Sequence, residues 1–379
     1  MDKSRIFFQN VWFVTLSGLG GFLLSLTGLP IGWMIGTLLI ATTLSILRPT
    51  FLKLTYKQDG LPKYWLYIGQ CILGVELGQK MNSSVLYIFQ ENWLTVTIML
   101  LLSIFCSLLS GIILWKYSNL DILTSFFSTA PGGLSAIPGI SEEVGANTGV
   151  VSIIQTMRVF LVILTIPVVI SLLFGNSDGN PPKMVTAENV IYSSENIVVT
   201  IIFVFIAVAG YYIGKILKFP APWLIGSMVC IAAVKFFSTG IIGDNVVAWW
   251  PHSLIIISQV FIGASIGSRF HKKMFVGLNR TLLVSFLCTA GLIVFVFTGA
   301  FFVSVVTDIT FITASLAFAP GGIAEMTTTA LVLNGDATFV VAVQVLRIIT
   351  VCITLPPFFR FLNYLEGKKR SHAPMPTEL

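Results

Sequence analysis

The stretch Ala130-Pro131-Gly132-Gly133 occurs again as Ala319-Pro320-Gly321-Gly322, 189 residues further along the chain. In both places the pattern Gln-x-x-Arg follows at the same distance, as Gln155-x-x-Arg158 and as Gln344-x-x-Arg347. Proline and glycine together interrupt a regular helix. The chain therefore carries two helix breaks, each followed by an arginine, at matched positions of a duplicated unit.

Two further patterns repeat in the same order and support the duplication. Gln-x-x-x-Gly-x-x-x-Gly begins at Gln70 and again at Gln259, with the same offset. Pro-x-x-Trp-x-x-Gly begins at Pro30 and at Pro220, where one residue has been inserted. We interpret the glycines as a packing face between helices. The two glutamines either join neighbouring helices or line a pathway.

The composition is that of a membrane protein. The chain is 55% hydrophobic and 10% charged, with a mean hydropathy of +0.92. In soluble domains roughly a quarter of all residues are charged. Several apolar stretches reach the ~20 residues that span a bilayer. The net charge of +6 comes from clusters at segment ends, which is typical of cytoplasmic loops. Nucleic acid is therefore not an expected partner.

We expect an all-α polytopic membrane protein built from two repeats. The chain divides into a first membrane repeat (1–174), a polar extracytoplasmic linker (175–195), a second membrane repeat (196–365) and a basic cytoplasmic tail (366–379). The predicted spans are about 11–27, 30–47, 64–80, 92–115, 146–174, 197–216, 220–239, 252–268, 281–306 and 336–362.

The regions 119–144 and 309–333, which hold the Pro-Gly-Gly breaks, allow two topologies. If they dip into the membrane and return, the repeats are inverted and all basic clusters lie inside, as the positive-inside rule requires. If they cross, the chain has twelve spans with parallel halves, and the clusters near Lys215 and Arg269 lie outside. We favour ten helices plus two re-entrant, broken helices, a common transporter plan, with twelve spans as the alternative.

The predicted substrate-binding residues are those of the breaks and of the polar helices that follow: Arg158, Arg347, Gln155, Gln344, Pro131, Gly132, Gly133, Pro320, Gly321 and Gly322. Broken backbone at membrane depth must face protein or a water-filled cavity. An arginine in mid-membrane costs at least about 2.5–3.5 kcal/mol and is retained where it meets a partner or substrate. Each glutamine shares the helical face of its arginine and could orient the guanidinium toward an oxyanion.

Alternatives remain for each of these groups. The breaks could be simple kinks, and each arginine could form a structural ion pair with a carboxylate near the breaks. The candidate carboxylates, which we also list as ion-coupling residues, are Glu142, Glu143, Glu325 and Asp336. Glu325 stands three residues after Gly322, where a carboxylate suits the start of a helix, and its counterpart in the first repeat is Ala136. We expect Glu76 to pair with Lys80 within one helix.

No catalytic apparatus is visible in the sequence. The three histidines share no helix face, the five cysteines form no C-x-x-C pair, and no metal-ligand spacing occurs. Nucleophile and phosphate-binding motifs are also missing. We expect no enzyme activity, no catalytic residue, no metal and no cofactor.

These residues resemble the bacterial membrane AbrB family, which is built from two copies of one membrane domain. The similarity covers about residues 10–362, and its most specific parts are GLPIGWMIG, FPAPWLIG, APGGLSAIPG, APGGIAEMTTTALVLNGD, QTMR and QVLR. Members are often labelled regulators of gene expression and sometimes ammonia monooxygenases. Oxygenase chemistry would need clustered metal ligands, which the sequence lacks. The proline breaks also look like the crossover region of bile-acid symporters and cation–proton antiporters, which implies an elevator-type carrier.

From the residues and the resemblance together we predict a secondary transporter of a small anionic solute, with H+ or Na+ as coupling ion and a site between the repeats. The alternative is a membrane-embedded regulatory or sensory protein that binds a ligand without moving it. The expected location is the bacterial plasma membrane, with both termini cytoplasmic. The lipid bilayer is the expected environment, and a homodimer is left open.

Overall fold

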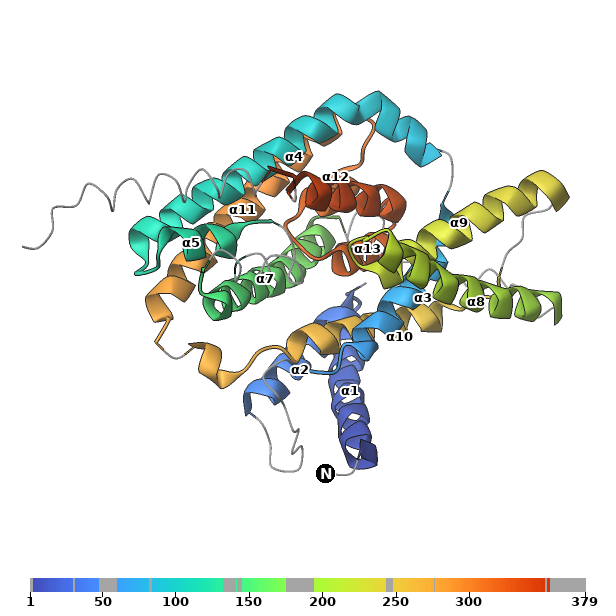
Figure 1. Cartoon of the computed structure of the whole chain (residues 1–379), viewed down its shortest axis with the longest axis horizontal. Helices are drawn as coiled ribbons and strands as arrows, with labels where there is room; N and C mark the ends of the chain where they lie inside the picture. The colour runs from blue at the N-terminus through green and yellow to red at the C-terminus, as the bar shows by residue number, and fades with distance from the viewer. Residues whose placement is uncertain are drawn as a thin grey trace, which may run out of the picture.

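The computed structural model describes residues 3–29, 31–47, 60–81, 84–131, 141, 145–174, 194–242, 248–275, 277–351 and 353–354. Within these ranges every regular element is a helix and no strand occurs (Figure 1). The first half contributes α1 (Lys3–Ser25), α2 (Gly32–Leu47), α3 (Tyr64–Lys80), α4 (Ser84–Tyr117), α5 (Ile122–Thr129) and α7 (Thr148–Phe174). The second half contributes α8 (Ser194–Ile216), α9 (Pro222–Ile242), α10 (His252–Gly267), η1 (Lys272–Phe275), α11 (Asn279–Val306), α12 (Phe311–Phe318), α13 (Ile323–Val332) and a last helix, Ala337–Val351.

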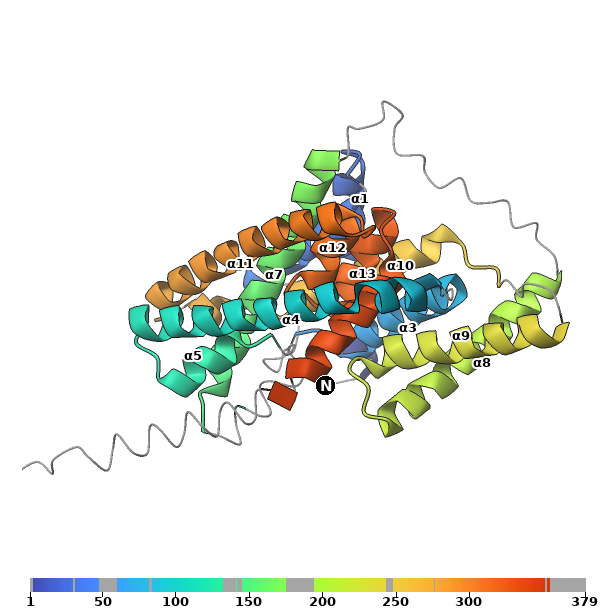
Figure 2. The ribbon, with the colours of Figure 1, turned by 90° about the horizontal axis from the view of Figure 1, so that it is seen from above.

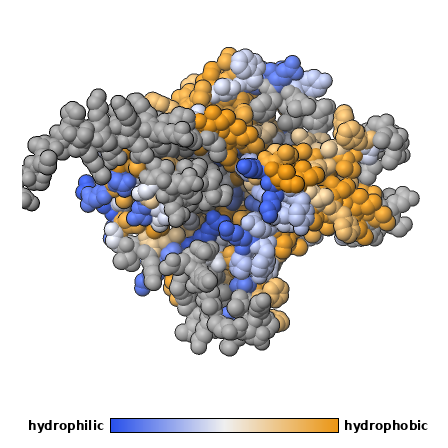
Figure 3. Space-filling model, viewed as in Figure 1, coloured by the Kyte–Doolittle hydropathy of each residue, from blue (hydrophilic) through white to orange (hydrophobic). Residues whose placement is uncertain are grey.

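The helices have the length and apolarity of membrane spans. Among the described residues, five are long and apolar enough to cross a bilayer, namely Phe7–Ser25, Gln90–Tyr117, Thr148–Leu173, Val198–Ile216 and Asn279–Val306, and five shorter apolar helices accompany them. Figure 3 shows large hydrophobic areas on one face, and many large apolar side chains are exposed, with Phe205 exposed to 72% and Val306 to 77%. The prediction of an all-α polytopic membrane protein is confirmed.

The helices form two bundles, visible in Figures 1 and 2. The first bundle contains α1, α2, α3, α8, α9 and α10, and the second contains α4, α5, α7, α11, α12 and α13. Between the bundles, α10 contacts α7 and α13, and α3 contacts α13. Each bundle therefore combines helices from both halves of the sequence.

The first bundle is held together by close helix contacts at glycine. A Cβ atom on Gly74 of α3 would lie 2.7 Å from the carbonyl oxygen of Leu224 in α9. At the matched position, a Cβ on Gly263 of α10 would lie 2.8 Å from the carbonyl oxygen of Met34 in α2. Only glycine permits such approach of two backbones. The predicted packing role of these glycines is confirmed.

Each Pro-Gly-Gly region begins and ends at the same level of the second bundle. The N–H of Asn147, after the first region, donates to Oγ1 of Thr124 at its start, at 2.9 Å. The N–H of Asp336 donates to Oγ1 of Thr313 in the same way, at 3.0 Å. A region that crossed the bilayer would have its ends about 30 Å apart. The two ends of each region therefore lie side by side in the second bundle.

Several predicted features lie outside the described residues. These are the basic tail (366–379), all but the last residues of the linker (175–195), and four of the candidate site residues, Gly132, Gly133, Glu142 and Glu143.

Candidate functional site

The two helix breaks meet inside the second bundle. Helix α12 ends at Phe318 and α13 begins at Ile323, so Pro320 interrupts the helix as predicted. In the first half α5 ends at Thr129, two residues before Pro131. Pro131 and Pro320 line one small cavity together with Arg347. The tips of the two regions are thus neighbours.

Each arginine binds the carbonyl groups where the first short helix of its region ends. Nη1 of Arg158 donates to the carbonyl oxygens of Thr129 (2.8 Å) and Ala130 (3.3 Å). Arg347 donates through Nη1 to Ala319, the residue equivalent to Ala130, and through Nη2 to Gly321 (3.0 Å). The last carbonyls of a helix lack partners within the helix and carry partial negative charge. A guanidinium donates hydrogen bonds to these carbonyls and places a positive charge beside their partial negative charge in the middle of an apolar bundle.

The two glutamines bind the same short helices. Nε2 of Gln155 donates to the carbonyl of Phe127 at 2.9 Å, and Nε2 of Gln344 donates to the equivalent carbonyl of Leu316, also at 2.9 Å. The glutamines therefore fix the broken regions directly, rather than orienting the guanidinium groups as expected. Their Oε1 atoms are buried without a hydrogen-bond partner.

The alternative of a structural ion pair is not seen among the described residues. The predicted pair within α3 is present, with Nζ of Lys80 2.8 Å from Oε1 of Glu76. Asp336 instead caps the last helix, because its Oδ1 accepts from the N–H groups of Thr338 (3.1 Å) and Phe339 (2.9 Å). Asp336 thus has a capping role, and it is not among the described residues that line the cavity between the bundles.

Glu325 lies in the first turn of α13, buried to all but 8% of its surface. Its carboxylate folds back against Gly322 and accepts a hydrogen bond from its own N–H. Arg269, at the end of α10 in the first bundle, is close enough to attract it electrostatically. Glu325 is thus a carboxylate at a helix start, and it also faces the other bundle.

A cavity of about 930 Å³ lies between the two bundles and brings most of the predicted residues together. From the second bundle it is lined by Pro131, Arg158, Pro320, Gly321, Gly322, Glu325 and Arg347. Gln70 of α3 lines it from the first bundle, whereas Gln259 is not among the described lining residues. The volume is in the range of small-molecule sites, about 300–1,000 Å³.

The cavity also contains groups that the sequence did not single out. Lys63, Lys218 and Arg269 lie where α3 begins and where α8 and α10 end, and all three line the cavity. Their position at segment ends is typical of cytoplasmic loop charges and does not indicate a site. Ser152 and Thr156 of α7 add hydroxyl groups. These two residues are four apart and share a helical face, but they do not stand at helical spacing from Arg158.

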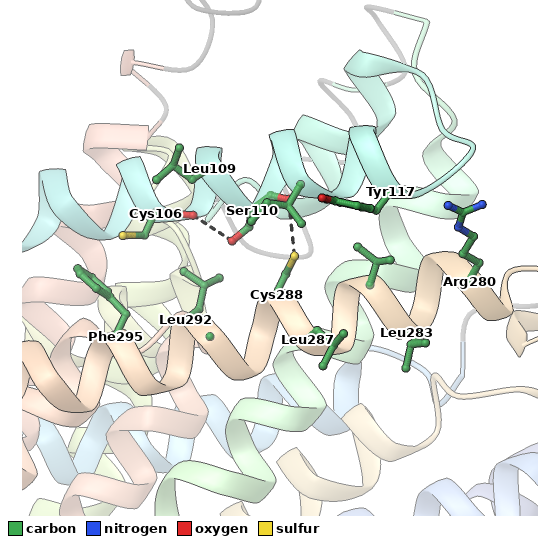
Figure 4. Close-up of a pocket in the computed structure, with 13 residues that line it drawn as sticks. Cys106, Leu109, Ser110, Tyr117, Arg280, Leu283, Leu287, Cys288, Leu292 and Phe295 are labelled. Atoms are coloured by element: carbon green, nitrogen blue, oxygen red, sulfur yellow. Dashed lines mark hydrogen bonds between the residues drawn. The ribbon is translucent and has the colours of Figure 1, made fainter.

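A second, apolar groove of about 640 Å³ runs between α4 and α11 (Figure 4). It is lined by leucine, phenylalanine and cysteine side chains, with Tyr117 and Arg280 at one end. Figure 4 shows two hydrogen bonds among these residues, from Oγ of Ser110 to the carbonyl oxygen of Cys106 and from Sγ of Cys288 to the carbonyl oxygen of Ser110. Both are formed between residues that line the groove. A site needs a few convergent polar groups, and only the cavity between the bundles has them. Among the described residues no cluster of His, Cys, Asp or Glu could hold a metal ion.

Comparison with known proteins agrees with the resemblance noted in the sequence. A family model described as "Transition state regulatory protein AbrB" matches residues 33–363. The chain is 46% identical over 373 residues to "Uncharacterized protein YhjN" of Bacillus subtilis, covering 98% of this chain and 97% of that protein. It is 27% identical over 310 residues to "Putative regulator AbrB" of Escherichia coli, covering 82% and 86%. The chain belongs to the AbrB family, as a membrane-type, all-helical member.

Proposed function

We propose that the protein is a secondary transporter of a small anionic solute. The observation that carries the proposal is the pair Arg158 and Arg347, which line one cavity and have no carboxylate within ion-pair distance among the described residues. Both are 4% exposed, and the Nε atom of each is buried without a hydrogen-bond partner. A buried cation that lacks a counter-charge is costly, and a bound oxyanion would supply that charge.

The charge around the cavity suits an anion. Five cationic side chains line it (Lys63, Arg158, Lys218, Arg269 and Arg347), against one described carboxylate, Glu325. A cleft with charge of one sign raises the local concentration of the opposite ion. Lys63, Lys218 and Arg269 belong to the basic segment ends that the positive-inside rule assigns to the cytoplasm. We therefore propose that the cavity opens to the cytoplasmic side.

The repeats are proposed to be inverted, giving ten spans and two re-entrant regions. Oγ of Ser258 in α10 donates to the carbonyl of Gly69 in α3, at 2.9 Å, and these residues are 189 apart. They are therefore equivalent positions of the repeat. Contact between a residue and its own equivalent is expected at a two-fold axis. An axis in the membrane plane relates the halves of many transporters.

The two bundles suggest the moving parts. The first bundle is closely packed at glycine and has few contacts with the second, so it suits a fixed frame. The second bundle carries the broken helices and both arginines. Movement of the second bundle along the first would expose the cavity to the other side. Glu325 is the proposed coupling group, because it lies on the second bundle, faces Arg269 of the first and lines the cavity.

The name of the Escherichia coli relative favours a second candidate, a membrane-embedded regulator that binds a ligand without moving it. Proteoliposomes containing the full chain separate the two. Uptake and counterflow of labelled organic anions would support the carrier, and binding without counterflow would support the regulator. Arg347→Gln should abolish uptake, whereas Arg280→Gln, which alters the apolar groove (Figure 4), should not. Uptake that survives Arg347→Gln would contradict our site assignment.

A further inference from the structure

We infer that the ligand is an organic dianion, with one acidic group bound by each of the two arginines. This inference rests on the proposed anion site and names the class of its ligand. It starts from the repeat, because Arg158 and Arg347 are equivalent positions and bind equivalent carbonyls, those of Ala130 and Ala319. The bundle therefore presents two guanidinium groups in matched settings to one cavity.

The two guanidinium groups repel each other across this space. Arg158 is close enough to act electrostatically on Arg347, and both are buried, so solvent screens the repulsion weakly. The backbone carbonyls that bind them contribute dipoles but no net charge. Among the described residues Glu325 is the one carboxylate at the cavity, and it is engaged by its own N–H and by Arg269. A monoanion would leave one of the two buried charges without compensation.

Hydrogen-bonding capacity also remains on both arginines. Each Nη group carries two hydrogens, so Nη2 of Arg347 retains one after donating to Gly321. The Nε–H of each arginine is buried without a partner. The edge formed by Nε and Nη2 is one of the two edges that bind a carboxylate through two parallel hydrogen bonds. Each arginine is thus held by carbonyls and keeps one donor, its Nε–H, without a partner.

The size and remaining walls of the cavity favour an organic ligand over a small inorganic ion. Its volume of about 930 Å³ exceeds what two acidic groups need. Between the charged groups it is lined by apolar side chains, including Leu66, Val159, Ile266 and Ile348. Ser152 and Thr156 supply hydroxyl groups beside Arg158. A short carbon chain that joins two acidic groups matches these surroundings.

The test uses matched ligands on the full chain in lipid nanodiscs. Binding of malonate, succinate, glutarate and adipate is compared with binding of their monoamides, which keep the shape of each diacid but carry one charge less. We expect at least one diacid to bind tenfold or more tightly than its own monoamide. Equal affinity within every pair would overturn the dianion inference and leave the proposed anion site standing. Binding of neither set would overturn both.

Variants then locate the two charges. Arg158→Gln and Arg347→Gln should each reduce the preference for the diacid over its monoamide to less than threefold, because each leaves only one of the two buried guanidinium groups. Arg280→Gln at the apolar groove is the matched control and should keep the full preference. A preference that persists in both cavity variants would overturn the inference. The arginines also hold the broken helices. The comparison of ligand pairs on the unaltered chain tests the inference without any variant.

Discussion

Replacing Arg347 by lysine tests whether the arginine fork, rather than its charge alone, holds the second broken region. Arg347 donates through two nitrogen atoms to the carbonyls of Ala319 and Gly321. A hydrogen bond that involves a charged group contributes about 1.5–3 kcal/mol. Lysine keeps the charge, but its single ammonium group on a shorter, unforked side chain keeps at most one of the two bonds. The expected loss is therefore one bond, about 1.5–3 kcal/mol.

That loss corresponds to a factor of about 10 to 100 in the equilibrium between the closed and the opened region. Hydrogen exchange of the amides in α12 and α13 measures this equilibrium, because local opening limits exchange in packed helices. We expect faster exchange there by that factor and unchanged exchange in α2 and α9, which belong to the first bundle.

The control is Arg280→Lys, at the far end of the apolar groove (Figure 4). It makes the same chemical change away from the broken regions and should leave exchange in α12 and α13 as it was. If Arg347→Lys also leaves it unchanged, the two hydrogen bonds do not hold the region, and the arginine is available entirely to the ligand.

Three further outcomes are expected. Asp336→Ala removes the cap of the last helix, so the thermal midpoint of the solubilised protein should fall by an amount equivalent to about 1 kcal/mol. Asn147→Ala should cause a smaller fall, because Oδ1 of Asn147 accepts one hydrogen bond, from the N–H of Val150 at 3.2 Å. No fall in either variant would show that the caps are dispensable. Gly74→Leu and Gly263→Leu should lower the yield of folded protein because the added side chain meets backbone, whereas Gly291→Leu, with nothing within 4 Å, should be tolerated; equal yields would contradict the close packing. Glu325→Gln should abolish uptake driven by a proton or sodium gradient while exchange of labelled solute persists, and gradient-driven uptake by this variant would rule out Glu325 as the coupling group.

The fold could be predicted well because its signals are local. The expected spans 197–216 and 281–306 correspond to α8 (Ser194–Ile216) and α11 (Asn279–Val306), since hydropathy and length determine where a helix can lie in a bilayer. The glycine spacing in α3 and α10 likewise reports directly on close packing. Hydropathy does not indicate which helices pack against one another. The division into two bundles depends on which helices meet, and each bundle takes members from both halves.

The candidate site could be predicted only in part. That Arg158 and Arg347 serve the breaks follows from the repeat, but their partners do not, because the carbonyls of Thr129 and Ala319 come close only when the broken region returns beside the following helix. From the sequence, a substrate oxyanion and a nearby carboxylate are the two alternatives for these partners. The capping role of Asp336 had a recognisable signal, an aspartate just before an apolar helix. Lys63 and Arg269 had none, because they come from separate helices that meet only in the folded bundle.

The duplication itself explains why the cavity carries an excess of charge. When two copies of a unit meet around a two-fold axis, each residue near the axis faces its own copy, so an arginine faces an arginine and not an acid. Opposite charges can meet there only after the copies diverge, as Glu325 and its counterpart Ala136 have done. At Arg158 and Arg347 the copies have not diverged, and the repulsion is retained inside an apolar bundle. A binding site for two acidic groups gives that cost a function, in addition to the hydrogen bonds that both guanidinium groups donate to the broken regions.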